Sequence, residues 1–525
     1  MPITPTYPGV YIEELPSSVR TITGVSTSVT AFIGRARRGL VDTATSVFSF
    51  SDYERTFGGL WEESAMSYAI HQYFLNGGAQ AVIVRVFNGN GTASLSFPGA
   101  GGPNDLVLDA ASPGSWGSDL LARVDHETKE DPDSVLFNLK IKDTLTGVEE
   151  THLNISVVDT DTRYVGKVLE ESSSLVLLNV ISGRPNPTPD PDPGATEFED
   201  SADGLAFSNA VEATGGSDAN NISQTEIIGS GASIPKTGLS AFDETDIINL
   251  LCIPPYLINN TVLDGDVDLA VRVAALAYAK SRRAIYIVDP LSGWNDASTP
   301  DIDVLGMGSD ENAALYFPRI KSPDLLQEGR LGSFVPCGAI AGLIARTDSQ
   351  RGVWKAPAGI EAGLSGVPEL TLQLTDQENG LLNPTGVNCL RAFKGVGRVA
   401  WGARTMRGAD KLADQWKYLP VRRLALFIEE SLYRGSQWVV FEPNDEPLWA
   451  QIRLNMGAFM HNLFRQGAFQ GATPKDAYLV KCDSETTTQN DINLGVVNIV
   501  VGFAPLKPAE FVIIKIQQLA GQVEA

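Results

Sequence analysis

The residue types that most often carry chemistry occur in this sequence, but their spacing builds no recognisable reactive site. The histidines stand singly, without an HExxH pair or a GxSxG serine turn. They are His71, His126, His152 and His461. The adjacent carboxylates Glu429 and Glu430 point to different sides of a predicted helix, so they do not form an acid–base pair. We therefore expect no catalytic residue, no metal site and no cofactor.

Three short segments match ligand-binding loops only in part. Residues 229–237 (GSGASIPKT) carry Pro235 where a phosphate-binding loop needs glycine before the lysine. Residues 395–400 (GVGRVA) match a dinucleotide fingerprint loosely, and a Trp-Gly pair follows where a helix should begin. Residues 264–268 (DGDVD) lack the spacing and the final glutamate of an EF-hand loop. The three segments predict surface loops and an acidic helix start instead of binding sites.

Composition predicts a large globular protein made in the cytoplasm. The chain has 525 residues, of which 43% are hydrophobic, enough for roughly two to four domains. Its first residues lack the basic and apolar regions of a secretory signal, and no apolar run approaches the ~20 residues of a membrane-spanning helix. The four cysteines stand singly, which predicts buried thiols in a reducing compartment.

Charge is distributed unevenly along the chain. The net charge is -23, which argues against nucleic acid as a partner because phosphate would be repelled. Residues 101–244 hold 26 acidic against 8 basic residues, so most of the negative excess lies in this middle segment. The stretch 391–423 is the clearest basic region, with nine Lys and Arg against Asp410 and Asp414.

Hydrophobic periodicity predicts a mixed α/β (α+β) multi-domain chain whose core combines the N-terminal and C-terminal parts. A strand, a helix and a strand are expected first, at residues 27–33, 61–75 and 81–87. Residues 246–253 and 284–288 predict parallel strands around a helix at about 266–281, so the layer resumes there. Apolar residues at helical spacing from 449 to 463 predict a long amphipathic helix against that sheet. The last expected strands are residues 478–481, 495–501 and 510–517.

Segments of a different character interrupt and flank these layers. After residue 88 the chain is acidic and β-rich, with strands expected at 135–141 and 152–158, and five prolines from 184 to 193 mark a surface loop. Extended, proline-bearing segments at both ends predict arms. The predicted parts are an N-terminal arm (1–24), a first core part (25–88), an inserted acidic β-rich outer domain (89–244), a second core part (245–504) and a C-terminal arm (505–525).

Two groups of short motifs, one near each end, occur in a fixed order along the chain. The N-terminal group is residues 7–14 (YPGVYIEE), 24–34 (GVSTSVTAFIG), 57–59 (FGG) and 73–78 (YFLNGG). The C-terminal group is residues 351–359 (RGVWKAPAG), 401–405 (WGART), 421–424 (VRRL) and 441–445 (FEPND). Taken together they are similar to the contractile tail sheath family of myophage tails, R-type pyocins and extracellular contractile injection systems. The resemblance covers roughly half of the chain, and the acidic middle segment carries none of it.

The resemblance implies a structural subunit and not an enzyme. It implies hexameric rings stacked into a helical sheath around an inner tube protein, with baseplate and terminal cap proteins, and contraction that drives the tube through a target membrane. It also implies a phage tail or phage tail-like particle that is assembled in the cytoplasm and then released or docked at a membrane through other components. Neither nucleic acid binding nor direct membrane insertion is expected. The competing interpretation is a discrete oligomeric or receptor-binding protein that uses the β-rich insertion.

Short apolar strands lie on the two predicted arms, outside the main layers. Left unpaired, such strands expose edges that favour pairing with other chains. Spacing alone favours pairing within the chain, whereas the resemblance favours exchange, in which each arm completes a sheet in a neighbouring subunit. The expected exchange residues are Val10, Tyr11, Ile12, Glu13, Phe511, Val512, Ile513, Ile514, Lys515 and Ile516.

The basic stretch is a candidate for a surface that faces the inner tube, in a C-terminal region that begins at about residue 385. Exposed basic side chains would meet an acidic tube through weak, salt-sensitive contacts. The alternatives are a solvated basic face and internal pairing with acidic residues. Arg422 and Arg423 stand directly before a helix expected at 424–432, so they border the core. The candidate tube-facing residues are Arg391, Lys394, Arg398, Arg404, Arg407, Lys411 and Lys417.

Overall fold

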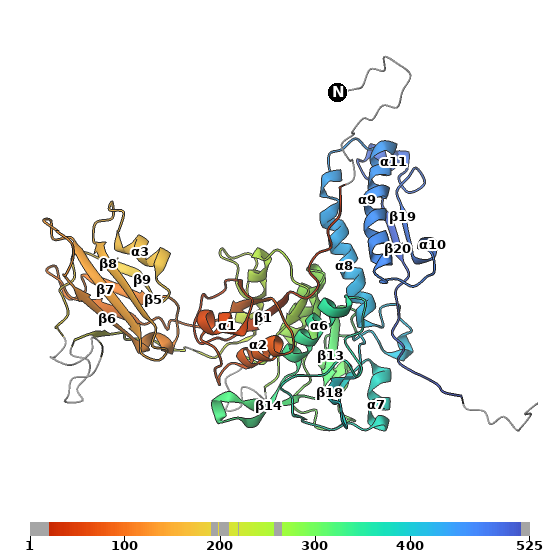
Figure 1. The fold of residues 1–525 in the computed structure, drawn as a ribbon, viewed down its shortest axis with the longest axis horizontal. Coiled ribbons are helices and arrows are strands. Elements are labelled where there is room, and N and C mark those ends of the chain that lie inside the picture. Colours follow the sequence, from red (N-terminus) through yellow and green to blue (C-terminus); the bar gives the residue numbers. More distant parts are fainter. Residues whose placement is uncertain (1–19, 191–197, 199–208, 219, 257–264, 516–525) are drawn as a thin grey trace, which may run out of the picture.

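A central α/β unit lies between an inserted β-rich unit and a helical unit near the C-terminus (Figure 1). This computed structural model describes residues 20–190, 198, 209–218, 220–256 and 265–515. In the view of Figure 1 the inserted unit forms one end of an elongated molecule, and the helical unit rises from the opposite side. The described residues form four hydrophobic core clusters, two in the central unit and one in each of the other units.

The central unit is built on an eight-stranded sheet in the order β18-β17-β13-β12-β11-β1-β3-β2. The strands are β1 (Thr30–Gly34), β2 (Thr45–Val47), β3 (Ala81–Arg85), β11 (Leu250–Cys252), β12 (Ile285–Val288), β13 (Ala313–Phe317), β17 (Asn388–Phe393) and β18 (Gly397–Ala400). The inner strands pair in parallel, and only β2 and β18, at the two edges, pair antiparallel. β1 lies between β3 and β11, which confirms the prediction that two separated parts of the chain build one sheet.

Helices cover both faces of this sheet, as the continuous apolar runs of its strands require. One face packs on α1 (Phe50–Phe57), α2 (Ala65–Leu75) and α6 (Cys337–Arg351), and the other packs on α4 (Gln224–Ile228) and α5 (Leu269–Ser281). The α2 and α6 backbones approach closely at Gly338, where an added Cβ would lie 2.0 Å from the carbonyl oxygen of Ala69. The helix predicted at 61–75 corresponds to α2, which begins later than predicted, at Ala65. It ends at Asn76 and Gly77 as expected, with φ +106° at Gly77.

Smaller elements complete the central unit. A three-stranded sheet in the order β15-β14-β16 is formed by β14 (Ile320–Asp324), β15 (Arg330–Phe334) and β16 (Glu369–Leu370). Helix α7 (Asp376–Leu382) begins with a capping box between Thr375 and Glu378, in which each side chain satisfies a backbone N–H of the other. This cap fixes the start of α7 next to β17, where the basic stretch begins.

The inserted unit has two antiparallel sheets around a core of its own. The strands are β4 (Ser94–Phe97), β5 (Leu106–Ala110) and β9 (Val176–Ile181) in one sheet, and β6 (Leu120–Asp125), β7 (Leu136–Asp143), β8 (Glu149–Ser156) and β10 (Val211–Glu212) in the other, with the helix α3 (Val165–Ser172). The strands expected at 135–141 and 152–158 correspond to β7 and β8, although β8 begins and ends earlier. The core runs from Ala93 to Ala213.

The expected boundary of the insertion at residue 244 is too late. Ile222, Ile227, Leu239 and Phe242 belong to the core of the central unit, against α5 and the sheet. The polar, glycine-rich composition of residues 215–240 hid these few apolar contacts, because they come from short helical turns without a periodic pattern. Asn88 and Asn220 lie side by side where the chain leaves and re-enters the central unit, with the Asn220 N–H donating to the Asn88 carbonyl at 3.0 Å.

The C-terminal unit contains two long helices and a β-hairpin. Its elements are α8 (Leu419–Gly435), α9 (Glu446–Arg465), α10 (Pro474–Ala477), β19 (Tyr478–Lys481), α11 (Gln489–Asn493) and β20 (Val500–Phe503). The long helix predicted around 449–463 is α9, but it packs on α8 and the hairpin, not on the central sheet, so that part of the prediction is wrong. Periodicity gives the buried face of a helix and not the surface that covers it.

Three further expectations in this unit need correction. α8 begins at Leu419, not at 424, so Arg422 and Arg423 lie inside the helix. The strand expected at 495–501 is the later β20. Residues 510–515, expected to start a strand, have no assigned strand partner within the described chain.

The four cysteines, Cys252, Cys337, Cys389 and Cys482, are free and buried, as predicted. None of the helices in the described residues is both long and apolar enough to cross a membrane.

Candidate interaction surfaces

The singly placed histidines and the adjacent carboxylates Glu429 and Glu430 make structural contacts. The His71 ring lies against Phe50 with 4.8 Å between ring centroids, and the hydroxyl of Tyr478 lies 3.3 Å from Nδ1 of His461. Glu430 on α8 binds Arg434 of the same helix at 2.7 Å and Arg283 at 2.8 Å, and the second contact ties α8 to the central unit. Among the residues described, no three or more His, Cys, Asp or Glu side chains are arranged to hold a metal ion. The candidate surfaces are therefore the arms, the hairpin and the basic stretch.

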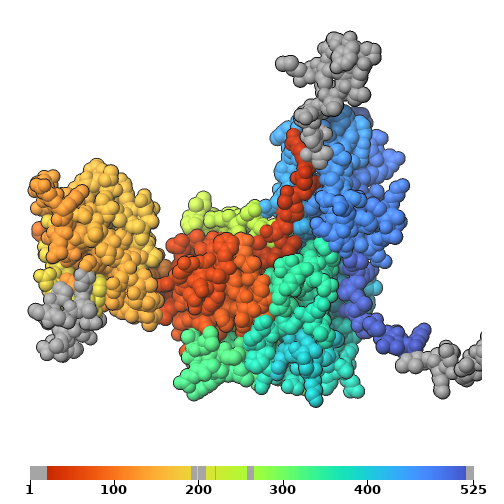
Figure 2. Space-filling model, in the orientation of Figure 1, coloured from red at the N-terminus to blue at the C-terminus, as the bar shows by residue number. Residues whose placement is uncertain are grey.

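The N-terminal arm runs along the helical unit. Val10, Tyr11, Ile12 and Glu13 lie outside the described residues. From residue 20 onward the chain lies as a narrow strip over the helices, as Figure 2 shows. The Arg20 N–H donates to Oδ1 of Asn455 at 3.0 Å, the Val25 N–H donates to Ser431 Oγ at 3.2 Å, and Ile22 is buried in the core of the unit. This arm is thus fixed to its own subunit as far back as Arg20.

The C-terminal arm leaves the body with its apolar side chains uncovered. The exposed fractions are 72% for Phe511, 82% for Val512, 81% for Ile513 and 79% for Ile514. Lys515 is also exposed, and Ile516 lies outside the described residues. A run of consecutive apolar side chains this exposed is unusual for a segment that works alone in water.

The hairpin formed by β19 and β20 is a two-stranded sheet. Its register pairs Tyr478 with Phe503 and Leu479 with Gly502, and one face packs on α9 through Tyr478 and Phe503. The side chain of Leu479 is 54% exposed. No third strand within the described residues pairs with either outer edge. The chain directly after β20 is bridged to Phe469 at Pro505, but Tyr478–Lys481 and Val500–Phe503 each have one strand neighbour. Two strands alone are marginally stable, so further strands added at these edges would stabilise the sheet.

The sequence predicts strand donors on the arms, but it does not indicate that β19 and β20 form a sheet of only two strands. It predicts the strand at 478–481, yet a sequence does not say how many neighbours a strand will have. The available signal was the isolation of this apolar segment near the C-terminus, after the residues that complete the central sheet.

The basic stretch divides into buried and exposed residues, and two of its candidates are not on the surface of this chain. Arg391 is buried and binds Asp376 at 2.7 Å. Arg404 is fully buried, with Glu510 at 2.6 Å and Asp410 at 3.0 Å. All side-chain donors of Arg404 are directed at internal partners, and Arg391 donates through Nη1 to Asp376 and through Nη2 to the Leu374 carbonyl while its Nε is buried, so neither guanidinium is available for a salt-sensitive surface contact. Internal pairing, one of the alternatives from the sequence, describes these two residues.

The other candidates are more open. Lys394 and Lys411 are exposed and Arg398 is half-buried. Arg407 binds Asp414 at 2.5 Å, and this hydrogen bond, with the charges of Asp414 and Glu311, raises the pKa of Arg407. Lys417 binds Asp410 at 2.6 Å. Even here much of the positive charge is paired within the chain.

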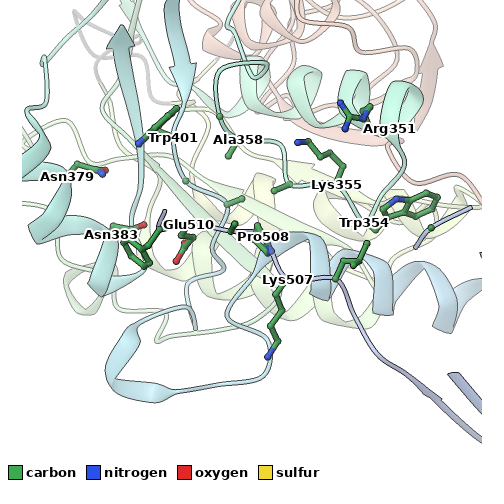
Figure 3. A pocket seen from close by; sticks show the side chains of 18 residues that line it. Arg351, Trp354, Lys355, Ala358, Asn379, Asn383, Trp401, Lys507, Pro508 and Glu510 are labelled. Atoms are coloured by element: carbon green, nitrogen blue, oxygen red, sulfur yellow. The ribbon is translucent and has the colours of Figure 1, made fainter. Parts of the chain in front are cut away.

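A groove of ≈ 680 Å³ lies where the C-terminal arm crosses the body. In the view of Figure 3 the arm residues Lys507, Pro508 and Glu510 lie between two sets of lining residues. Asn379, Asn383 and Trp401 are on one side, and Arg351, Trp354 and Lys355 are on the other. The groove is thus partly made by the arm itself.

Two family models match the chain, and they lie in sequence order. Residues 237–406 match the phage tail sheath protein central domain, and residues 413–518 match the phage tail sheath C-terminal domain. Together they cover just over half of the chain. Two curated tail sheath proteins also match over shorter segments. That of Vibrio phage KVP40 is 31% identical over 127 residues, 24% of this chain and 18% of that protein, and that of Enterobacteria phage T4 is 27% identical over 163 residues, 30% of this chain and 23% of that protein.

Solved structures match over nearly the whole chain. The helical sheath of the anti-feeding prophage in its contracted state has a TM-score of 0.57 at 22% identity, covering 98% of this chain and 100% of that one. The PVC sheath complex of an extracellular contractile injection system, also contracted, has a TM-score of 0.55 at 20% identity, covering 99% of each chain. A sheath tail protein from Listeria innocua has a TM-score of 0.58 at 12% identity, covering 93% and 96%. These likenesses establish a shared fold.

Proposed function

Because the chain belongs to the phage tail sheath family, we propose that it polymerises into a helical sheath around an inner tube and that contraction of this sheath drives the tube through a target membrane. The matched segments span only about a fifth of the length of each of the two curated relatives. The proposal is therefore argued from the surfaces of this chain as well as from its family. One observation carries the proposal. The same chain has an exposed apolar arm and a two-stranded hairpin with open edges.

An arm that donates a strand and a hairpin that accepts one give a head-to-tail contact between copies. Main-chain hydrogen bonds would provide the strength of that contact, and alternate side chains such as Leu479 would provide the register. A head-to-tail contact that does not close on itself generates an open helix. We assign strand donation to Val10–Glu13 at one end and to the segment from Phe511 to Ile516 at the other.

The proposed partners are further copies of this chain in stacked hexameric rings, an inner tube protein, and baseplate and terminal cap proteins. One solved structure with this fold is the anti-feeding prophage baseplate, with a TM-score of 0.55 at 23% identity, covering 98% of this chain and 99% of that one. For the tube, the exposed Lys394 and Lys411 are the strongest contact candidates, joined by the partly paired Arg407 and Lys417. Arg398 is a weaker candidate.

The chain acts as a mechanical component and not as an enzyme in this proposal. The energy of the stroke is the difference between an extended lattice, held in a kinetic trap, and a contracted one. Assembly takes place in the cytoplasm, and the particle is released or docked at a membrane through other components. Contraction of a purified extended sheath that required ATP would contradict this account.

The direct test is electron microscopy of the expressed chain in negative stain. The full chain and a variant lacking residues 1–19 are compared at the same concentrations, because this deletion leaves the described contacts of Arg20 and Ile22 in place. We expect hollow helical tubes from the full chain and folded monomers from the truncated one. Discrete globular oligomers from both would overturn the proposal and favour a receptor-binding protein.

A further inference from the structure

The C-terminal arm is attached to the body by one strong ion pair. The Arg404 guanidinium donates to Glu510 through Nε at 2.8 Å and through Nη2 at 2.6 Å. This two-pronged geometry is the strongest arrangement available to arginine and a carboxylate. The Arg404 side chain is 0% exposed and that of Glu510 is 16% exposed, so water does little to weaken the pair.

Arg404 is held in place before it meets the arm. Its Nη1 donates to the Asn383 carbonyl at 2.8 Å and to Asp410 at 3.0 Å. Its backbone N–H donates to Oδ1 of Asn388 at 2.7 Å, and its own carbonyl accepts from Nδ2 of Asn388, also at 2.7 Å. Burial alone would lower the pKa of Arg404, but the bonds to Glu510 and the nearby acidic charges outweigh burial and raise it. The arm therefore meets a rigid, fully charged site.

Glu510 is the charged residue that joins the arm to the body. Leu506 is 38% exposed, and the uncovered run begins at Phe511, the very next residue. Of the charged side chains on the described arm, only Glu510 forms an ion pair with the body. Tyr418 adds a hydroxyl that donates to Glu510 at 3.3 Å, and the Lys417 ammonium lies 3.9 Å away.

We propose that the Arg404–Glu510 pair is a latch that fixes where the C-terminal arm leaves its own subunit, and thereby positions Phe511–Ile514 to pair with a neighbouring copy. This inference rests on the proposed function, since it concerns how the exchanged strand is presented. Glu510 is a positioning residue here and does not itself contact the neighbour.

Without the latch, the arm would be held only by its preceding contact with the body. Before Glu510, the arm is last paired to the body at the bridge between Phe469 and Pro505. Releasing Glu510 frees five more residues, which lets the start of the exchange strand wander by up to roughly 17 Å. A looser tether lowers the effective concentration of the strand at its acceptor. It also weakens the register, because a shift of one residue moves each side chain to the opposite face.

The first test is Glu510→Ala in the full chain, with Glu361→Gln as the control. Glu361 also binds an arginine, Arg351 at 3.0 Å, but both side chains are more than half exposed. We expect Glu510→Ala to raise the concentration needed for tube formation about tenfold or more. It also leaves Nε and Nη2 of the buried Arg404 without their acceptor, so the melting temperature of the monomer should fall as well. The control should match the wild type in both. Tubes from Glu510→Ala at the wild-type concentration would overturn the latch.

A second pair of variants separates the latch from a general role in stability. A four-residue Gly-Ser insertion directly after Glu510 adds slack beyond the latch and should impair tube formation with the ion pair intact. The same insertion between Leu506 and Lys507 adds slack before it and should be tolerated, because Glu510 still sets the point of departure. Equal behaviour of the two insertions would overturn the proposal. Failure of the wild-type chain to form tubes would instead contradict the proposed function.

Discussion

The inserted unit and the C-terminal unit differ in how their strands are paired and covered. The inserted unit packs two sheets on a shared core from Ala93 to Ala213, and the bridge between Ser94 and Thr214 links the two sheets at β4. The C-terminal unit ends in the β19–β20 hairpin and in an arm whose apolar side chains face water. The difference is that the sheets of the inserted unit share a core inside the chain, although β8 and β9 stand at their edges, whereas the C-terminal unit has the two-stranded hairpin and the exposed arm that we propose are completed by further copies.

The largest expected effect comes from ending the chain after Glu510. This variant keeps the ion pair with Arg404 but removes the exposed run that begins at Phe511. Since the described part of that run has no strand partner inside the chain, we expect the monomer to melt at the same temperature and tube formation to be lost. Sedimentation and calorimetry of the same samples test both statements. If the truncated chain still forms tubes, the arm is not needed for contacts between copies.

A cavity in the inserted unit should have the opposite effect. Phe137 on β7 is 0% exposed in that unit's core. We expect Phe137→Ala to lower the free energy of unfolding of the inserted unit by about 3–5 kcal/mol, while tube formation stays normal. Hydrogen exchange of β6, β7 and β8 measures the first quantity and electron microscopy the second. Loss of tubes in this variant would mean that the inserted unit takes part in assembly.

A charge on the open face of the hairpin should act on assembly alone. Leu479 is 54% exposed, so Leu479→Lys removes little buried area in the monomer. We expect roughly a tenfold higher concentration for tube formation, because one alternate side chain of the completed sheet becomes unfavourable. Leu153→Lys on β8 is the matched control, since Leu153 is 50% exposed on the inserted unit. Equal effects of the two substitutions would contradict a special role of the hairpin in assembly.

The pH dependence of the inserted unit is set in part by Glu150. Burial favours the neutral form of this carboxyl group, but His152, whose Nε2 lies 3.5 Å away, and hydrogen bonds from Ser173 and Ser174 outweigh it and lower its pKa to about 2. Because the pKa is lowered in the folded state, the ionised carboxyl group stabilises the fold at pH values above its ordinary pKa of about 4.5. This stabilisation is lost as the pH falls towards 2. We therefore expect Glu150→Gln to cost about 2 kcal/mol at pH 7 and progressively less below pH 4.5, as measured by urea unfolding. A cost independent of pH would contradict this role.

The smallest effect is expected at the exposed basic side chains. Lys394 and Lys411 lie in water in the single chain, and exposed charge contacts contribute about 0–1 kcal/mol each. Reversing both to Glu should leave tube formation by the chain alone unchanged and make binding to an acidic inner tube weaker and less sensitive to salt. Co-sedimentation with the tube protein at two salt concentrations measures this. Unchanged binding would favour the solvated basic face.

The sequence predicted the elements of this fold better than their partners. The parallel strands were recognisable because burial on both faces leaves continuous apolar runs, as in β12, and α9 because its apolar residues recur at helical spacing. The prediction that α9 packs on the central sheet is wrong, because periodicity shows which face of a helix is buried and not which element covers it. For the same reason the sequence does not predict that Arg404 is buried and paired. Its partner Glu510 is 106 residues away in the sequence, and only the fold brings the two side chains together.

The central claim is that copies of this chain complete the β19–β20 hairpin. Hydrogen exchange measured on the monomer and on assembled tubes tests it directly, because amides at an open edge exchange freely and amides in a ladder do not. We predict that the amides of Tyr478–Lys481 and Val500–Phe503 become strongly protected on assembly, while those of β6, β7 and β8 keep the same rates in both states. Unchanged exchange in the hairpin within well-formed tubes would contradict the account.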